Sequence, residues 1–414
     1  MADTPNVRFK GFQDAWEWRK LSEYLTVSTE KNTENIFNKT DVLSVSGDYG
    51  IVNQIEFQGR SFAGTSVSNY GVVYTDDVVY TKSPLRSNPY GIIKTNKGNT
   101  GIVSTLYAIY RPKENVFANF VQTYFEQHAR LNNYMHPLVN KGAKNDMKVS
   151  SENALKGSVV FPKYEEQKKI SSFFADLDHL IILYQRKCDE TKELKKYMLQ
   201  KMFPRDGKKT PEIRFAGFTD DWEPCKFGDG NDLLTGYPFE SEKFVEDGIK
   251  LVRGMNVKRG YLDFSEEICM KWNSSDGLEN YLLKDGDILI QMDGALIGQS
   301  YAKIKEDQLP ALLVQRVTRV RTKKGIADSD FMYQTIQRDF LAYIGMNKTE
   351  TAVPHLSLND IKNFTIMAPA IEEQRKLGTY FANLDNLITL QQCKCDALKE
   401  VKKYMLQNMF PQKG

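Results

Sequence analysis

The sequence predicts an α+β protein built as two tandem halves, each with a mixed domain followed by one long helix. A segment of 43 residues occurs twice without a gap, at residues 162–204 and 369–411, and 27 positions are identical. A shorter match, PNVRFKGFQDAWE at Pro5 and PEIRFAGFTDDWE at Pro211, opens each half. The long stretches in between share no sequence that aligns. Shared parts imply one task done twice, and divergent parts imply two targets.

The composition of the chain argues against a metalloprotein and a membrane protein. The chain has 414 residues, 41% hydrophobic and 26% charged, which is ordinary for a globular protein of two or three domains. The net charge of +3 means that any basic surface must be local. Five scattered cysteines and four histidines contain no ligand spacing typical of zinc, so we expect no metal site. Free thiols, no apolar leader and no long apolar run favour a cytoplasmic protein without a membrane span.

The repeated segment predicts a long amphipathic helix in each half. Apolar residues recur at alternating steps of four and three, the seam of a coiled coil, which Lys195 and Lys402 interrupt at matching points. Glutamates in the first turn and prolines at either end mark the limits. The residues predicted to pair the helices are Ile170, Phe174, Leu177, Ile181, Leu377, Phe381, Leu384 and Ile388.

Two arrangements would cover these apolar stripes. Each helix could pack on its own domain, or the two copies could pack on each other. The second is favoured, because identical surfaces in tandem repeats pair about a pseudo-twofold axis. The pair would then be an antiparallel coiled coil with one variable domain at each end. The predicted limits are a domain at 1–160, a helix at 161–204, a second domain at 205–367 and a second helix at 368–414.

Both variable segments read as several short strands followed by a helix. Strand-like runs are broken by Gly, Asn and Asp, and a helical pattern follows at residues 119–135 and again at 328–346. The order is the same although the residues differ, so we infer one α+β fold used twice. The loops carry side chains that can bond a base edge or a phosphate. The candidates for DNA binding are Lys82, Ser83, Arg86, Asn88, Tyr90, Lys141, Lys144, Arg253, Asn256, Lys258, Gln291, Asp293, Asn347, Lys348 and Thr349.

Catalytic signatures are not found in the sequence. No P-loop occurs, and Ser, His and Asp form no recognisable triad. The stretch SNPYG is similar to the Asn-Pro-Pro-Tyr of adenine methyltransferases, but it has a single proline and no Gly-rich cofactor loop upstream. We therefore expect a chain that is not catalytic by itself.

The organisation resembles the specificity subunit of type I restriction–modification enzymes. The resemblance covers the whole chain and is carried by RFKGF and RFAGF with their tryptophans, by the EEQ helix openings and by the duplicated KKYMLQ…MFP ends. The YGI turn near Tyr49, the pair Val79-Tyr80 and GIVSTLY from Gly101 look like one recurring type of target-recognition domain. The second domain looks like a different type.

The resemblance implies that each variable domain reads one half of a bipartite, asymmetric site in double-stranded DNA. It implies that the paired helices set the length of the unread spacer. Its partners would be two modification subunits, which methylate adenine, and restriction subunits. S-adenosylmethionine, ATP and Mg would belong to those partners and not to this chain. Two other hypotheses stay open: a non-DNA scaffold with two ligand domains joined by a coiled coil, and a self-sufficient DNA enzyme.

Overall fold

The structure, a computed structural model, divides into two compact units. It describes residues 4–82, 88–139, 149–205, 207–293, 298–347 and 356–411. Unit 1 comprises Met1–Gln185 and Cys393–Gly414, and unit 2 comprises Arg186–Gln392. Each unit therefore contains one variable segment together with parts of both long helices. The predicted limits, which separate domains from helices, stay a prediction.

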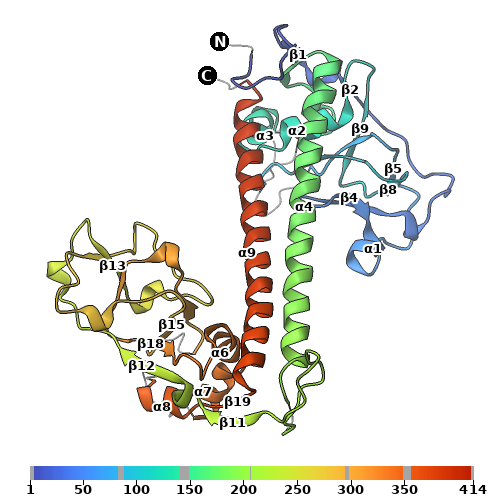
Figure 1. The fold of residues 1–414 in the computed structure, drawn as a ribbon. Coiled ribbons are helices and arrows are strands. Elements are labelled where there is room, and N and C mark those ends of the chain that lie inside the picture. Colours follow the sequence, from blue (N-terminus) through green and yellow to red (C-terminus); the bar gives the residue numbers. More distant parts are fainter. Residues whose placement is uncertain are drawn as a thin grey trace. The chain divides into compact units, whose positions relative to one another are not determined.

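Unit 1 is organised around a four-stranded antiparallel sheet (Figure 1). Its order is β2 (Leu25–Val27), β9 (Ala108–Pro112), β6 (Val78–Tyr80) and β7 (Ile93–Thr95). Three two-stranded sheets accompany it: β1 (Glu17–Lys20) with β10 (Ser158–Phe161), β3 (Leu43–Ser46) with β4 (Gly50–Asn53), and β5 (Gly71–Val73) with β8 (Gly101–Val103). The short helices are α1 (Gln54–Gln58), α2 (Ala118–Phe125) and α3 (His128–Met135). β6 and β8, which are rich in β-branched residues, are buried along their whole length, whereas β1 is exposed.

Unit 2 also contains a four-stranded antiparallel sheet. Its order is β12 (Asn231–Thr235), β18 (Val317–Thr322), β15 (Ile288–Gln291) and β16 (Tyr301–Lys303). Beside it are β14 (Lys271–Trp272), β13 (Ile249–Val252) and β17 (Ala311–Leu313) in one sheet, and β11 (Glu223–Lys226) with β19 (Thr365–Ala368) in another. The short helices are α5 (Phe227–Gly230), α6 (Ser329–Thr335), α7 (Leu341–Asn347) and α8 (Leu358–Asn363).

The two main sheets have the same connectivity although their sequences do not align. In both sheets, the strand that comes first in the chain pairs with the strand that comes last, and this last strand also pairs with the first strand of a hairpin. The register also corresponds, since Tyr80 lies opposite Ala108 in unit 1 and Ile290 lies opposite Thr318 in unit 2. This agrees with the inference that one α+β fold is used twice.

The two long helices are α4 (Tyr164–Lys201) and α9 (Ile371–Asn408), each of 38 residues. A buried glutamine fixes the start of each one. Gln167 donates to the carbonyl of Pro162 at 2.9 Å, and Gln374 donates to the carbonyl of Pro369 at the same distance. The repeated EEQ sequence is therefore a helix-start motif, because its glutamine amide satisfies the carbonyl of the proline that precedes the helix.

The core of each unit is completed by the end of the long helix that begins in the other unit. Met409 and Phe410, which follow α9, are buried in unit 1 with the aromatic residues of α2 and β10. Met202 and Phe203, which follow α4, are buried in unit 2. We call Phe203 and Phe410 the helix-end phenylalanines. The duplicated MFP sequence therefore supplies a core residue to each unit, which the apolar periodicity alone did not predict.

Candidate nucleic-acid interface

The residues predicted to pair the helices make two kinds of contact. Ile170, Phe174 and Leu177 belong to the core of unit 1, and the corresponding residues Leu377, Phe381 and Leu384 belong to the core of unit 2. Each set packs on the variable domain of its unit and also on the end of the other helix. Ile181 and Ile388 are half-buried. Both arrangements weighed from the sequence are thus represented by contacts within each unit.

Two buried ion pairs join the opening motif of each half to the start of its long helix. Arg8 contacts Glu166 through two hydrogen bonds of 2.7 Å, and Arg214 contacts Glu373 through two of 2.8 Å. Both glutamate side chains are at most 2% exposed. The hydrogen bond to Glu166 raises the pKa of Arg8, and that to Glu373 raises the pKa of Arg214. The RF-GF motif therefore clamps the first turn of the helix with a two-pronged, charge-assisted contact.

The lysines that interrupt the apolar seam are also ion-paired. In unit 2, Lys195 of α4 donates to Asp385 of α9 at 2.6 Å. In unit 1, Lys402 of α9 donates to Asp178 of α4 at 2.6 Å and to Glu126 at 2.5 Å. Burial lowers the pKa of Lys195. Burial also opposes the charge on Lys402, but its two carboxylates outweigh that effect and the pKa is raised.

The candidate residues of unit 1 lie near the end of β6. Lys82 has a left-handed backbone, φ 53°, and donates through Nζ to the carbonyl of Thr105 at 3.0 Å. Burial lowers its pKa. Asn88 is buried, and Tyr90 packs against the core. Ser83, Arg86, Lys141 and Lys144 lie outside the described residues. Of the candidate residues of unit 1 that the structure describes, Lys82 is thus hydrogen-bonded to the turn that precedes β9.

The candidate residues between β13 and β14 support their own loop. Asn256 is fully buried; its amide accepts from the backbone N–H of Arg253 at 3.0 Å and donates to the carbonyl of Asp263 at 2.9 Å. Arg253 donates to the carbonyl of Ile268 at 2.6 Å. Lys258 is half-buried. The prediction that Asn256 reads a base stays without support from this geometry, because its side chain has no exposed surface.

Gln291 and Asp293 lie at the end of β15 and face two neighbouring loops. A Cβ added to Gly254 would come within 3.2 Å of Gln291 Nε2, so glycine there allows the close approach. Asp293 Oδ2 is 3.3 Å from Nη1 of Arg316, a residue that the sequence did not single out. Asn347 ends α7, whereas Lys348 and Thr349 lie outside the described residues.

Arg316 lies on a tight turn that has a counterpart in unit 1. The N–H of Val317 bonds the carbonyl of Val314 at 3.3 Å, closing the turn between β17 and β18. In the same way, the N–H of Tyr107 bonds the carbonyl of Ser104 at 3.0 Å, between β8 and β9. The third residue is Arg316 in one turn and Leu106 in the other. The sequence of residues 312–322 does not predict this turn, because it contains no Gly, Pro, Asn or Asp.

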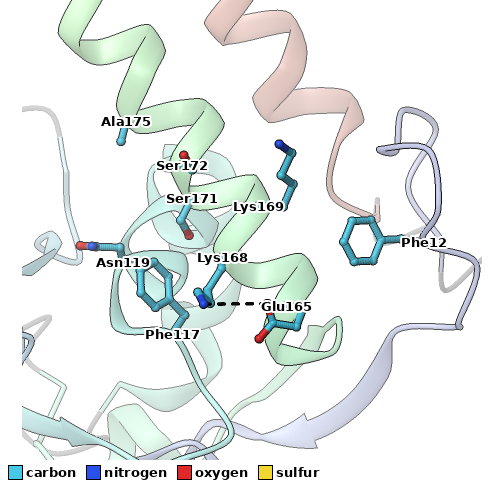
Figure 2. A pocket seen from close by; sticks show the side chains of 9 residues that line it. All are labelled: Phe12, Phe117, Asn119, Glu165, Lys168, Lys169, Ser171, Ser172 and Ala175. Carbon is cyan, nitrogen blue, oxygen red and sulfur yellow. Dashed lines mark ion pairs between the residues drawn. The ribbon is translucent and has the colours of Figure 1, made fainter.

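A groove of about 590 Å³ lies along the first turns of α4. Figure 2 shows its lining side chains, with the ion pair between Lys168 and Glu165 at 3.8 Å drawn as a dashed line. Ser171 Oγ in this groove is buried without a hydrogen-bond partner. Gly378 occupies the matching place in unit 2, where a Cβ would come within 2.2 Å of a carboxylate oxygen of Asp328. The groove lies on the repeated helix and has no nucleophile paired with a base.

In the described part of the chain, no group of three or more His, Cys, Asp or Glu could hold a metal ion. No helix in those same residues is long and apolar enough to cross a membrane.

Comparison with known proteins shows which proteins this chain is similar to. The sequence profile described as "Type I restriction modification DNA specificity domain" matches residues 219–400. The chain is 26% identical over 257 residues to the type I restriction enzyme MjaVIII specificity subunit of Methanocaldococcus jannaschii, covering 60% of each protein. It is 29% identical over 185 residues to the EcoAI specificity subunit of Escherichia coli, covering 44% of this chain and 30% of that subunit.

The fold is also that of a solved relative. The crystal structure of the type I restriction–modification S subunit from M. genitalium matches with a TM-score of 0.65 and 11% sequence identity, covering 99% of this chain and 100% of that one. At this identity the match shows the fold alone. The sequence matches confirm the resemblance predicted from the repeated motifs: residues 219–400 match the specificity domain of type I restriction–modification systems, and the chain is similar to type I specificity subunits.

Proposed function

We propose that this chain is the DNA sequence-specificity subunit of a type I restriction–modification complex and that it is not itself catalytic. Each variable domain reads one half of a bipartite, asymmetric DNA site. The chain recruits two modification subunits, which methylate adenine, and restriction subunits. S-adenosylmethionine, ATP and Mg are held by those partners, and the complex works in the cytoplasm.

One observation carries the proposal: two domains with the same sheet connectivity are attached by identical contacts to repeated helices, yet their turns differ. The buried pairs Arg8–Glu166 and Arg214–Glu373 have the same geometry in units 1 and 2. The turns beside the main sheets differ in chemistry, as Leu106 and Arg316 show. A common frame with divergent turns suits two readers of unrelated half-sites, since sequence is read by side chains that reach base edges.

The two helices pair as an antiparallel coiled coil with pseudo-twofold symmetry in this proposal. Contacts within the units support it. In unit 1 Asp178 meets Lys402, and Gln185 meets Cys395, so partner numbers fall as the α4 number rises. The equivalent pairs in unit 2, Asp385 with Lys195 and Gln392 with Cys188, follow the same order. Such a pair of rigid helices fixes the length of the unread spacer.

The test is the methylation pattern of a genome. The chain is expressed with its modification subunits in cells that lack other adenine methylation, and N6-methyladenine is detected directly by sequencing. We expect one bipartite motif with a methylated adenine in each half, lost when this gene is deleted. An unchanged genome, with soluble complex present, would reject the proposal and leave a scaffold of two ligand domains as the better hypothesis.

A further inference from the structure

The tight turns before β9 and β18 occupy the same place in the two domains. Each connects the strand that precedes it in the chain, β8 or β17, to a central strand of the main sheet. In each, the third residue stands two positions before the register pair that fixes the sheet, Ala108 or Thr318. Leu106 is 61% exposed, and the side chain of Arg316 is 71% exposed.

The backbone of the second turn is held on both sides. The N–H of Gln315 bonds the carbonyl of Tyr237 at 2.9 Å, and the carbonyl of Arg316 accepts from the N–H of Met292 at 2.9 Å. Arg316 has φ 69°, a left-handed conformation that favours glycine or asparagine. Arg316 therefore has a long side chain at a position whose left-handed backbone conformation disfavours any residue with a Cβ atom. Backbone strain of this kind is concentrated at functional positions.

Stability does not explain the arginine. Its ion pair with Asp293 is largely exposed on the arginine side, and exposed ion pairs contribute little to folding. The contact of 3.3 Å places Nη1 of Arg316 beside the carboxylate of Asp293, whose side chain is only 21% exposed. An oriented, exposed guanidinium matches the two acceptors on the major-groove edge of guanine.

The turn of unit 1 presents different chemistry at the same place. Leu106 is apolar, and Lys82 is tied to the carbonyl of the preceding residue, Thr105. The lysine Nζ thus supports the turn. An exposed apolar side chain at a DNA surface suits the methyl group of thymine, which is the one apolar feature of the major groove.

We propose that the third residue of this turn is a base-reading position in each domain: Arg316 hydrogen-bonds a guanine in one half-site, and Leu106 contacts a thymine methyl in the other. The inference rests on the proposed function, because it names the contacts by which that function is carried out. Asp293 is the positioning residue for Arg316. A phosphate contact by Arg316 is the competing role, and it would carry no sequence information.

The experiment uses the full chain with its modification subunits and the genome-wide methylation assay described above. Arg316→Ala should lower discrimination at one guanine position by about 10- to 100-fold and leave the other half-site unchanged. Arg316→Lys keeps the charge but not the two-pronged geometry, so it should not restore discrimination. Arg316→Gly removes the guanidinium and fits the left-handed backbone, so it provides the same test if the alanine variant folds poorly.

Leu106→Arg supplies the converse test. It should change one preference in the half-site read by the other domain, from thymine towards guanine. Lys243→Ala is the matched control, an exposed lysine of unit 2 that is ion-paired to Glu240 at 2.8 Å and lies on a different loop. It should leave every position unchanged.

Several results would overturn the inference while leaving the proposed function intact. These are a motif without guanine in the affected half-site, unaltered discrimination in Arg316→Ala and Arg316→Gly, or uniformly weaker methylation that Arg316→Lys restores. The last result would assign Arg316 to a phosphate. If the unaltered chain directs no bipartite methylation at all, the proposed function itself fails.

Discussion

Replacing a helix-end phenylalanine should weaken one unit and spare the other. Phe410 is 1% exposed in the core of unit 1, where its ring centroid lies 6.0 Å from that of Trp16 and 5.9 Å from that of Phe120. The guanidinium of Arg130 lies 4.6 Å from the centre of the same ring. Phe410→Ala removes a ring that aromatic and charged neighbours surround, and the side chains around it cannot close the space without moving.

The magnitude follows from burial. Truncating a buried phenylalanine to alanine costs about 3–5 kcal/mol, because apolar transfer energy and a cavity are both lost. That is a large share of the roughly 5–15 kcal/mol that stabilises a domain. We therefore expect a loss of about 4 kcal/mol in unit 1. Since each factor of ten corresponds to about 1.4 kcal/mol, globally exchanging amides of unit 1 should exchange nearly a thousandfold faster.

The assay is hydrogen exchange followed by mass spectrometry under native conditions, because it measures opening free energy peptide by peptide. Peptides of β6 and β9 should lose protection in Phe410→Ala, whereas those of β15 and β18 should not. Phe203→Ala should give the opposite pattern. Tyr404→Ala, at a residue 55% exposed, is the control and should change stability by less than about 0.5 kcal/mol. A loss under about 1 kcal/mol, or one equal in both units, would refute the assignment of Phe410 to the core of unit 1.

Three further predictions concern the repeated helices. Lys402→Met should destabilise unit 1 by about 1–3 kcal/mol, since it leaves two carboxylates without their cation. Because the pKa of Lys402 is raised from 10.5, the difference from wild type in denaturant titrations should stay constant from neutral pH up to pH 10.5 and shrink above it. A chain of residues 1–206 should form a dimer by light scattering, with Phe203 of each copy completing the core of the other, and Phe203→Ala should make it monomeric. Inserting four residues after Lys187 and four after Lys394 lengthens each helix by about 6 Å, so the methylated motif should gain one or two spacer base pairs and keep both half-sites. Altered half-sites with an unchanged spacer would contradict the proposal that the helix pair sets the spacer length.

The two long helices could be predicted from the sequence because the segment that forms them occurs twice. Limits of α4 and α9 follow from prolines, glutamates and periodicity, which are local signals. What the helix ends and seam lysines contact could not be predicted, since Lys195 meets Asp385 and Lys402 meets Asp178, residues far away in the chain. From the sequence alone, a lysine in an apolar seam only interrupts the pattern, because its carboxylate partner lies on the other helix.

The residues proposed to read bases were harder to predict, for a different physical reason. Polar side chains in loops either face solvent or satisfy the loop's own backbone, and sequence does not separate these roles. Asn256 satisfies its own loop and is fully buried, whereas Arg316 is exposed. The turn of Arg316 has no sequence signal, because it contains Gln and Arg between an Ala-Leu-Leu strand and a β-branched strand, without the residues that usually mark a turn.

The repeated contacts explain how one frame can hold two domains of different sequence. Each domain is held through the same elements: an arginine clamp on the helix start, a glutamine that accepts a backbone N–H before the domain helix, and a helix-end phenylalanine against a tryptophan. Gln167 accepts from Phe117, and Gln374 accepts from Asp328. Phe203 contacts Trp222 as Phe410 contacts Trp16. None of these contacts involves the turns that carry Leu106 and Arg316. The surface that holds a domain is thus separate from the surface proposed to read DNA, so a turn can change its chemistry without disturbing the attachment.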